Sequence, residues 1–255
     1  MGNGRGLSAT VIAQDESARI GDCLDSLRWV DEIIVVDGGS ADATREVSRG
    51  HGARVLENPW PGYAAQKNFA LDNASHPWIL SLDADERVTD DLKREIQTLL
   101  DREEPECDGY FVPRRNIFWG RWMKSKSFYP DYQMRLFRKH AGRFNDRGVH
   151  ESVEIQGRTG TLRGALEHRS YEDLGDYLRR LERYSQLAAL DLQARGVRPR
   201  WTHLCLRPPV RFFRNLVLMR GFTDGIDGLI FSALDAFYVF AKYARLLELT
   251  KDPDA

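Results

Sequence analysis

Apolar and polar positions alternate in short blocks along the first hundred residues, and these blocks predict alternating strands and helices. Residues 7–14 form a short apolar run, and residues 32–37 form a β-branched run of the kind found in strands buried on both faces. Between them, apolar residues recur with the spacing of one helix face, at Ile20, Cys23, Leu24 and Leu27. This order predicts a layered α/β domain with a mostly parallel central sheet.

The remaining elements of the first hundred residues follow from the same patterns. Two further strands are expected, at residues 54–57 and 78–82. Three further helices are expected, one beginning near Asp42 or Thr44, one over residues 64–74, and one from a Thr89 cap to Leu100.

The pattern changes after residue 108. Residues 109–168 are rich in aromatic residues, arginine and glycine, and they predict a mixed extension of the sheet with strands at residues 132–137, 150–155 and 162–167. From Asp173 onward the pattern is helical, with an apolar stripe formed by Leu174, Tyr177, Leu178, Leu181, Tyr184 and Leu187. A last helix is predicted after Gly225.

Charge is unevenly distributed along the chain. The 37 basic and 38 acidic residues give a net charge of −1, which argues against a nucleic-acid binder, because such domains are usually strongly basic. Residues 1–110, however, hold 11 basic and 22 acidic side chains, whereas residues 111–255 hold 26 and 16. The chain therefore has an acidic first part and a basic second part.

The basic part contains a segment suited to a membrane surface. Residues 192–223 carry seven arginines and no acidic residue, and apolar residues such as Trp201 and Phe213 are interleaved with them. Such a segment can lie on an anionic leaflet, which makes a membrane a better partner than nucleic acid. The alternative is a helical cap packed on the rest of the protein, with solvated arginines.

The cysteines and the hydropathy pattern indicate the compartment. Cys23, Cys107 and Cys205 are far apart and match no metal or redox spacing. No stretch resembles a signal peptide, and no uncharged apolar run approaches the roughly 18 residues that a membrane-spanning helix needs. A cytoplasmic protein that does not span a bilayer is expected.

Two carboxylates, Asp83 and Asp85, follow directly after the strand predicted at residues 78–82. In an open α/β sheet, ligands bind outside the carboxyl ends of the strands. Carboxylates separated by one residue at that position can bind a hard divalent cation, which in turn can bridge phosphates. The alternative for such a pair is a solvated turn.

Asp37 ends another strand and is followed by Gly38, Gly39 and Ser40. Its carboxylate can accept hydrogen bonds from a base or a ribose, and the glycines permit close backbone approach; the alternative is a cap for the next helix. Lys67, near the start of a predicted helix, is a candidate for binding a diphosphate. Neither the G-x-G-x-x-G nor the P-loop fingerprint is present at these strand ends.

Four motifs in order resemble those of family 2 glycosyltransferases, which have the GT-A fold. They are Val11-Ile12-Ala13-Gln14-Asp15-Glu16, Val35-Val36-Asp37-Gly38-Gly39-Ser40-Ala41-Asp42, Ala65-Gln66-Lys67-Asn68 and Leu82-Asp83-Ala84-Asp85-Glu86. Within that family the chain most resembles the branch that includes the lipopolysaccharide inner-core β-1,4-glucosyltransferases. The motifs cover residues 7 to about 155.

The resemblance implies a donor site for a nucleoside-diphosphate sugar, with a UDP-hexose as the expected donor. Asp37, with Gly38 and Ser40, would hold the uracil or ribose, and Ala13, Gln14 and Glu16 would line the same pocket. Lys67 would face the diphosphate, Asp83 the ribose or the metal, and Asp85 a Mg²⁺ or Mn²⁺ ion. The chain departs from the family at Asp15, where the family often has asparagine.

The resemblance also implies an inverting single displacement, which requires a carboxylate to accept the proton of the attacking sugar hydroxyl. Two candidates lie downstream of the metal motif: Glu151, which is favoured, and Asp131. The neighbouring His150 is a candidate ligand for the metal or the diphosphate. Arg135 and Arg138 are expected to face either phosphates or solvent.

These expectations define a hexosyltransferase that acts on a lipid-linked or lipopolysaccharide-core acceptor. Residues 1–170 would form the GT-A catalytic domain, with residues 1–110 as its donor-nucleotide half and residues 111–170 as its acceptor half. Residues 171–255 would form a helical extension on the inner face of the cytoplasmic membrane. The rival hypotheses are a nucleotidyltransferase on a similar α/β fold and a non-catalytic adaptor that binds glycans or membranes.

Overall fold

The computed structural model describes residues 6–102, 105–145, 152–171 and 173–251. The chain divides into two compact units. Unit 1 comprises the residues up to Arg115 together with Asp131–His168, and unit 2 comprises Asn116–Pro130 and the residues from Arg169 onward. Residues 116–130, which the sequence analysis assigned to the acceptor half, thus pack with the C-terminal helices.

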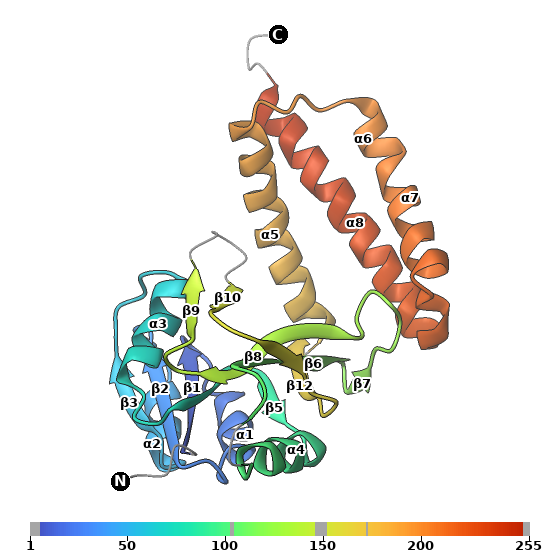
Figure 1. Ribbon diagram of the computed structural model, residues 1–255. Coiled ribbons are helices and arrows are strands. Elements are labelled where there is room, and N and C mark those ends of the chain that lie inside the picture. Colours follow the sequence, from blue (N-terminus) through green and yellow to red (C-terminus); the bar gives the residue numbers. More distant parts are fainter. Residues whose placement is uncertain (1–5, 103–104, 146–151, 172, 252–255) are drawn as a thin grey trace. The chain divides into compact units, whose positions relative to one another are not determined.

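Unit 1 is built on a sheet whose first four strands are parallel (Figure 1). Their order across the sheet is β3-β2-β1-β4. The strands are β1 Leu7–Ala13, β2 Glu32–Asp37, β3 Arg54–Glu57 and β4 Trp78–Asp83. The helices of this part are α1 Ile20–Asp25, α2 Thr44–Gly50, α3 Tyr63–Asn73 and α4 Asp90–Leu100. The predicted α/β class and the predicted order of these elements are confirmed.

The sheet continues beyond β4 with antiparallel strands. Its further order is β8-β6-β12-β5, formed by β8 Asp131–Arg138, β6 Gly109–Phe118, β12 Leu166–Tyr171 and β5 Glu86–Val88. Two short strands, β7 Arg121–Trp122 and β11 Thr159–Thr161, pair with β6. A separate two-stranded sheet joins β9 Gly142–Asn145 to β10 Ser152–Ile155. The strand predicted at residues 162–167 is wrong in position, because the pairing with β5 begins at Leu166.

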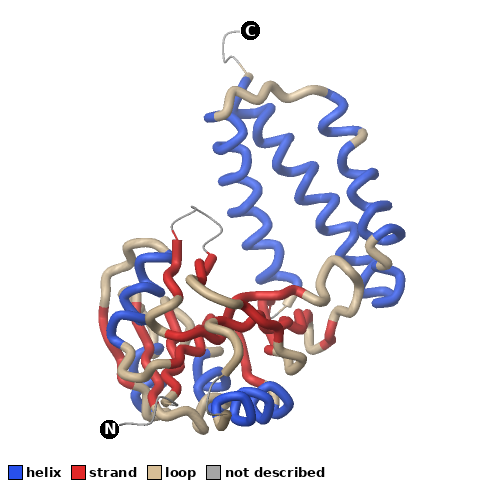
Figure 2. The backbone as a smooth tube through the Cα atoms, in the orientation of Figure 1, coloured by secondary structure: helices blue, strands red, loops and turns tan. Residues whose placement is uncertain are grey.

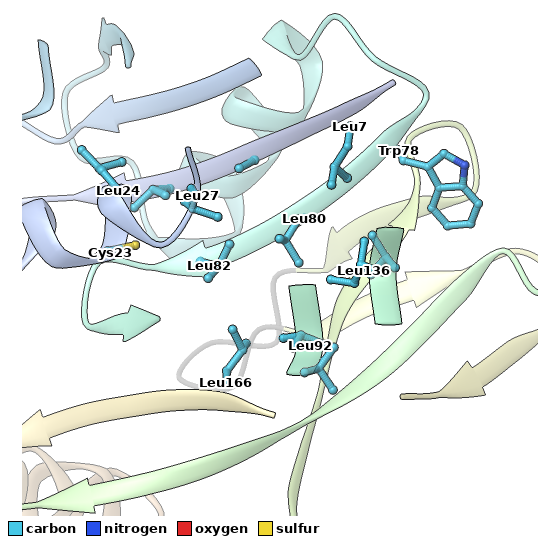
Figure 3. Close-up of a cluster of buried hydrophobic side chains, with 14 of the residues drawn as sticks. Leu7, Cys23, Leu24, Leu27, Trp78, Leu80, Leu82, Leu92, Leu136 and Leu166 are labelled. Atoms are coloured by element: carbon cyan, nitrogen blue, oxygen red, sulfur yellow. The ribbon is translucent and has the colours of Figure 1, made fainter. Parts of the chain in front are cut away.

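Two hydrophobic clusters cover the two faces of this sheet. Leu80 and Leu82 of β4 belong to the cluster that includes Leu24 of α1 and Leu92 of α4, and Figure 3 shows these side chains converging. Ile79, which precedes Leu80, belongs to the second cluster, together with residues of α3 and β9. Since successive side chains of a strand point to opposite faces, both faces of β4 are covered. This double burial explains why its sequence is mostly apolar, with Ser81 as the one polar residue before Asp83.

The C-terminal part of unit 2 is helical. From residue 173 to residue 251 the described chain contains helices and loops without strands (Figure 2). The helices are α5 Leu174–Ala194, α6 Trp201–Cys205, α7 Arg207–Phe213 and α8 Gly225–Thr250. A π-helical turn, Arg214–Leu218, and a 3₁₀ turn, Gly221–Asp224, connect α7 to α8.

The packing of α5 differs from the stripe read in the sequence. Leu181, Ser185 and Ala189, spaced by four residues, form its buried positions, and Ala189 packs with Tyr243 and Leu246 of α8. Four residues of the predicted stripe are exposed instead: Leu174, Leu178, Tyr184 and Leu187. Among the described helices, none is both long enough and apolar enough to cross a membrane.

Candidate active site

The carboxyl ends of three parallel strands meet at one edge of the unit 1 sheet. Ala13, the last residue of β1, is paired in register with Asp37, the last residue of β2. On the other side of β1, Ile12 is paired with Asp83, the last residue of β4. Ala13, Asp37 and Asp83 therefore share this edge of the sheet.

The loops that follow β1 and β2 are tied to each other at this edge. The Asp15 amide donates to Ser40 Oγ at 2.9 Å, and the Ala41 amide donates to Asp15 Oδ1 at 2.8 Å. The Glu16 amide donates to Thr44 Oγ1 at 2.8 Å. Asp15 has a φ of +57°, a backbone region that asparagine and aspartate enter more readily than other residues with a side chain. The two loops, residues 14–17 and 38–44, are thus held together by hydrogen bonds, and we call them the braced rim. Gln14 is exposed on it.

Asp42 extends this brace. Its carboxylate accepts hydrogen bonds from the Ser17 and Thr44 amides, both at 3.0 Å. Burial raises the pKa of Asp42, but hydrogen bonds from Ser17 and Thr44 outweigh it and hold the pKa well below its usual range. Asp42 thus stays ionised and α2 begins at Thr44, the later of the two predicted positions.

Asp37 is fully buried and its oxygens are engaged within the turn that follows it. Its Oδ1 accepts hydrogen bonds from the amides of Gly39, at 3.1 Å, and Ser40, at 3.0 Å, and Ser40 Oγ also donates to its carboxylate. A Cβ on Gly38 would lie 2.5 Å from the ring of Trp60. Gly38 therefore permits the close approach of Trp60 to the backbone.

Lys67 and Arg135 converge on Asp83. The Lys67 ammonium, on α3, lies 2.9 Å from Asp83 Oδ1, and the Arg135 guanidinium, on β8, lies 2.6 Å from Asp83 Oδ2. Burial raises the pKa of Asp83, but Arg135 and Lys67 outweigh it and hold the pKa well below its usual range. About a third of the Asp83 side chain, 32%, remains accessible to solvent. An ionised carboxylate with two cations thus stands at the edge.

Glu86 and Arg114 extend this cluster, and the sequence analysis assigned a role to neither. Glu86 is fully buried; one oxygen accepts from the Asp83 amide at 3.0 Å, and the other contacts Arg135 at 2.6 Å and Arg114 at 3.3 Å. The available signal for Glu86 was its place in the Asp83-Ala84-Asp85-Glu86 motif. Arg135 is correspondingly buried between two carboxylates, away from solvent.

Asp131, one of the two candidate bases, is the far end of this cluster. Its Oδ2 accepts hydrogen bonds from Arg114 Nε at 2.9 Å and Nη2 at 2.6 Å, and its Oδ1 accepts one from Gln133 at 2.8 Å. Burial raises the pKa of Asp131, but Arg114 outweighs it and lowers the pKa below the usual value. Because a general base works best with a pKa near the working pH, this environment weakens Asp131 as a proton acceptor.

Asp85 has a different environment from Asp83. Its Oδ2 lies 3.4 Å from His168 Nε2, and 16% of its side chain is accessible. Carboxylate oxygens with partial access suit a hard divalent cation. No group of three or more His, Cys, Asp or Glu side chains positioned for a metal occurs among the described residues. His150, the expected third ligand, and Glu151, the favoured base, lie outside them.

Arg138 does not reach this edge. It is paired in register with Trp78, the first residue of β4, whereas Asp83 is the last, so roughly 16 Å of strand separates the two positions. Its guanidinium stacks 4.7 Å from the Trp78 ring and lies 3.5 Å from Asp108. Arg138 therefore lies away from the strand ends, with 24% of its side chain accessible to solvent.

This edge of the sheet contains both cationic side chains, which can bind an anion, and carboxylates, which can bind a cation. Lys67, Arg114 and Arg135 are fixed cations, and Asp83, Glu86 and Asp131 are carboxylates within the same chain of contacts. Asp85 contacts His168 instead. Gln14 is exposed on the braced rim beside them.

Comparison with known proteins identifies relatives over most of the chain. The model of the family described as glycosyl transferase family 2 matches residues 8–169. A lipopolysaccharide core biosynthesis glycosyltransferase, LpsC of Rhizobium meliloti, is 32% identical over 252 residues, covering 93% of each chain. An uncharacterised glycosyltransferase of Rickettsia typhi is 29% identical over 255 residues, covering 96% of this chain and 87% of the relative.

A solved structure resembles the fold. Residues 1–349 of TarS from S. aureus, in complex with UDP-GlcNAc, superimpose with a TM-score of 0.50 at 16% identity. The match covers 95% of this chain and 90% of that one. At this identity the likeness concerns the fold.

Proposed function

The chain belongs to glycosyl transferase family 2 and has the GT-A fold, and we propose from this that it transfers a hexose from a UDP-sugar to a lipopolysaccharide-core or lipid-linked glycan. The acceptor class is supported by the LpsC relative, which matches nearly the whole chain. The donor class is supported by the UDP-GlcNAc complex of TarS. The observation that carries the proposal is the convergence of Lys67 and Arg135 on Asp83 at the edge of the sheet.

The donor would bind along this edge. Gln14, Glu16 and the backbone of the braced rim would contact the nucleoside, while Asp37 and Ser40 hold the rim in shape through their hydrogen bonds. Lys67 would meet the diphosphate, exchanging part of its contact with Asp83 for phosphate oxygens. Arg135 would stay in place because Glu86 also holds it. The site would thus gain an anionic ligand without leaving a buried carboxylate unpaired.

A divalent cation, Mg²⁺ or Mn²⁺, fits the carboxylates at the end of β4. Asp85 would hold it, with Asp83 and His150 as further ligands. When bound, such an ion offsets the negative charge that develops on a departing diphosphate. His168, 3.4 Å from Asp85, would orient that carboxylate.

A carboxylate must accept the proton of the attacking acceptor hydroxyl in an inverting displacement. We assign this role to Glu151. Asp131, the alternative, is held by Arg114 at 2.6 Å and has a lowered pKa, so its proton affinity is poor. As the hydroxyl oxygen bonds to the anomeric carbon, its proton would pass to Glu151 and the bond to the diphosphate would break.

Unit 2 would hold the protein at the inner face of the cytoplasmic membrane. Large apolar side chains are exposed on its basic segment, among them Trp201 at 69%, Phe213 at 62% and Leu218 at 70%. Arginines at positions 198, 200 and 220 flank them, and the whole of residues 192–223 contains no carboxylate. Apolar side chains can enter the interface of a leaflet while the arginines contact anionic headgroups.

A binding and turnover experiment tests the proposed function. Calorimetry with UDP, UDP-glucose and UDP-GlcNAc, each with and without Mn²⁺, should give a binding isotherm for UDP, and incubation with the matching sugar donor should release UDP. A protein that binds none of these nucleotides would refute the proposal and favour the adaptor hypothesis. Release of pyrophosphate from a nucleoside triphosphate would instead identify a nucleotidyltransferase.

A further inference from the structure

Unit 2 contains a cavity of about 510 Å³ that the proposed chemistry at the sheet edge does not use. Its walls come from the end of β6, the loop of residues 125–128, α5, the segment from α7 to the 3₁₀ turn, and α8. All of its lining residues belong to unit 2. This volume lies within the range of small-molecule binding sites, roughly 300–1,000 Å³.

One wall of the cavity is aromatic. It is formed by Phe118, Phe128, Tyr171, Tyr177 and Phe231. The rings are already packed on one another: Phe118 lies 4.2 Å from Phe231 and 5.3 Å from Tyr171, centroid to centroid. These described rings therefore leave no space between them in which a nucleobase could stack. Aromatic faces at the wall can still contact the apolar CH face of a pyranose.

Ser125, one of the lining residues, has a buried hydroxyl that no described residue hydrogen-bonds. Ser125 is 2% exposed, and among the described residues its Oγ has no hydrogen-bond partner. Buried polar groups are nearly always hydrogen-bonded, so an exception points to a missing ligand. The Ser125 backbone is fixed, because its amide donates to Asp224 Oδ2 at 3.0 Å and the Lys126 amide donates to the Met219 carbonyl at 3.0 Å. The hydroxyl is thus held in a preformed wall.

The charged groups of the cavity are mostly cations. Lys126, Arg211 and Arg214 line it, and Asp235 is its one carboxylate. Arg211 and Asn215 both donate to Asp235, whereas Lys126 has no carboxylate partner among the described residues. Burial, Tyr171 and Asp235 raise the pKa of Tyr177, so its phenol stays protonated and keeps a donor. The lining therefore favours an anion that also carries hydroxyl groups.

We propose that this cavity binds an anionic sugar unit, a hexose that carries a phosphate or a carboxylate. Its anionic group would contact Lys126 and Arg214, one hydroxyl would bond to Ser125, and its CH face would lie on the aromatic wall. That this sugar belongs to the acceptor glycan rests on the proposed function. The binding itself does not depend on catalysis at the sheet edge.

Ligand-observed NMR titration of the full-length protein tests this inference. The probes are glucose 6-phosphate, glucuronate, glucose, inorganic phosphate and UMP. At least one of the two anionic hexoses should bind with a Kd tenfold or more below those of glucose and inorganic phosphate. Equal binding of glucose, of inorganic phosphate or of UMP, or no binding of either anionic hexose, would overturn it.

Variants locate the binding in the cavity. Ser125→Ala should weaken anionic-hexose binding about threefold to tenfold, while its Tm stays equal or rises because an unsatisfied buried hydroxyl is removed. The double variant Lys126→Ala/Arg214→Ala, at two exposed positions, should abolish the preference over glucose. Ser185→Ala, whose hydroxyl bonds to the Glu182 carbonyl within α5, is the matched control. Unchanged binding in both cavity variants would refute the site.

UDP binding measured on the same samples separates this inference from the proposed function. Loss of anionic-hexose binding with UDP binding intact would contradict the cavity alone. Absence of UDP binding with anionic-hexose binding intact would contradict the proposed function alone.

Discussion

Glu86 and Arg135 form an ion pair at 2.6 Å in which the Glu86 side chain is fully buried and that of Arg135 is 6% exposed. Such a pair is costly to break, because the remaining charge is left without compensation in a poorly solvated place. Arg114 shares the same carboxylate, so Glu86 balances two guanidinium groups at once. The pair therefore fixes the strand end that carries Asp83.

Replacing Glu86 should destabilise the fold. Glu86→Gln keeps the side-chain volume but removes the charge, and we expect a loss of about 3–5 kcal/mol in the free energy of unfolding. Chemical denaturation followed by circular dichroism measures it. Asp91→Asn is the control, since Asp91 pairs with Arg94 on the surface and such pairs contribute about 0–1 kcal/mol. Similar losses in the two variants would contradict the buried role of Glu86.

Lys67 should contribute to donor affinity. Lys67→Ala removes a charged hydrogen-bond donor, which is worth about 1.5–3 kcal/mol, and we therefore expect a roughly 10- to 100-fold increase in the Kd for UDP. Calorimetry at constant ionic strength gives this value. Lys93→Ala, on α4, serves as the control. An unchanged Kd in Lys67→Ala would mean that the diphosphate does not meet this residue.

The stability of the protein should decline in acid because of Asp83. Its pKa in the folded chain lies well below the usual value of about 4, so the unfolded chain binds more protons than the folded one as the pH falls through that value. The contribution of the ionised Asp83 carboxylate to the free energy of unfolding is fully present above about pH 5. It is lost as the pH falls toward the pKa of Asp83 in the folded chain. Urea denaturation between pH 7 and pH 3 should show a shallower decline in Asp83→Asn than in the wild type. Parallel curves would exclude Asp83 as a source of the effect.

Replacing each of the two candidate bases by its amide should distinguish their roles. Glu151→Gln should lower transfer about 10²- to 10⁴-fold while the Kd for UDP stays within about twofold. Asp131→Asn should instead lower stability, because Arg114 loses one of its two carboxylate partners, and leave measurable transfer in the folded fraction. Product formation and Tm are the two measurements. Abolished transfer in Asp131→Asn with an unchanged Tm would move the base to Asp131.

The exposed apolar residues of the basic segment should matter for membrane binding. The double variant Phe213→Ser/Leu218→Ser removes two side chains that a leaflet could bury, and we expect at least a tenfold loss of binding to phosphatidylglycerol vesicles. Leu187→Ser/Leu190→Ser, on the exposed part of α5, is the matched control. Co-sedimentation at two salt concentrations measures both. Equal losses in the two double variants would assign the contact to α5 as well.

The parallel half of the fold could be predicted because its central strands, β1, β2 and β4, are largely buried on both faces and are therefore mostly apolar. All seven residues of β1 are buried, and a strand of this kind stands out against its polar flanks. The carboxylates at the strand ends followed from the same pattern, since parallel strands bring their carboxyl ends together. Asp83 was found in this way, whereas Lys67 was found from its place near the start of a predicted helix.

The antiparallel half resisted prediction because its signals depend on partners distant in sequence. In β6, Pro113 and two adjacent arginines interrupt the alternation that marks a strand. Arg114 and Arg135 look like surface charges until the register of β6 and β8 places them beside Asp131, Asp83 and Glu86. Pairings of this kind are properties of the register, which no local pattern contains.

Cys23 lies behind the strand end that carries Asp83, and its Sγ is 3.7 Å from the Asp83 carbonyl oxygen. Burial, followed by the nearby carboxylates of Glu86, Asp85 and Asp83, raises the pKa of this thiol well above its usual value. A thiol reagent will therefore label the exposed Cys205 at once and Cys23 only when α1 separates from the sheet. The rate at which Cys23 is labelled, measured relative to that of Cys205, therefore reports local opening at the candidate site.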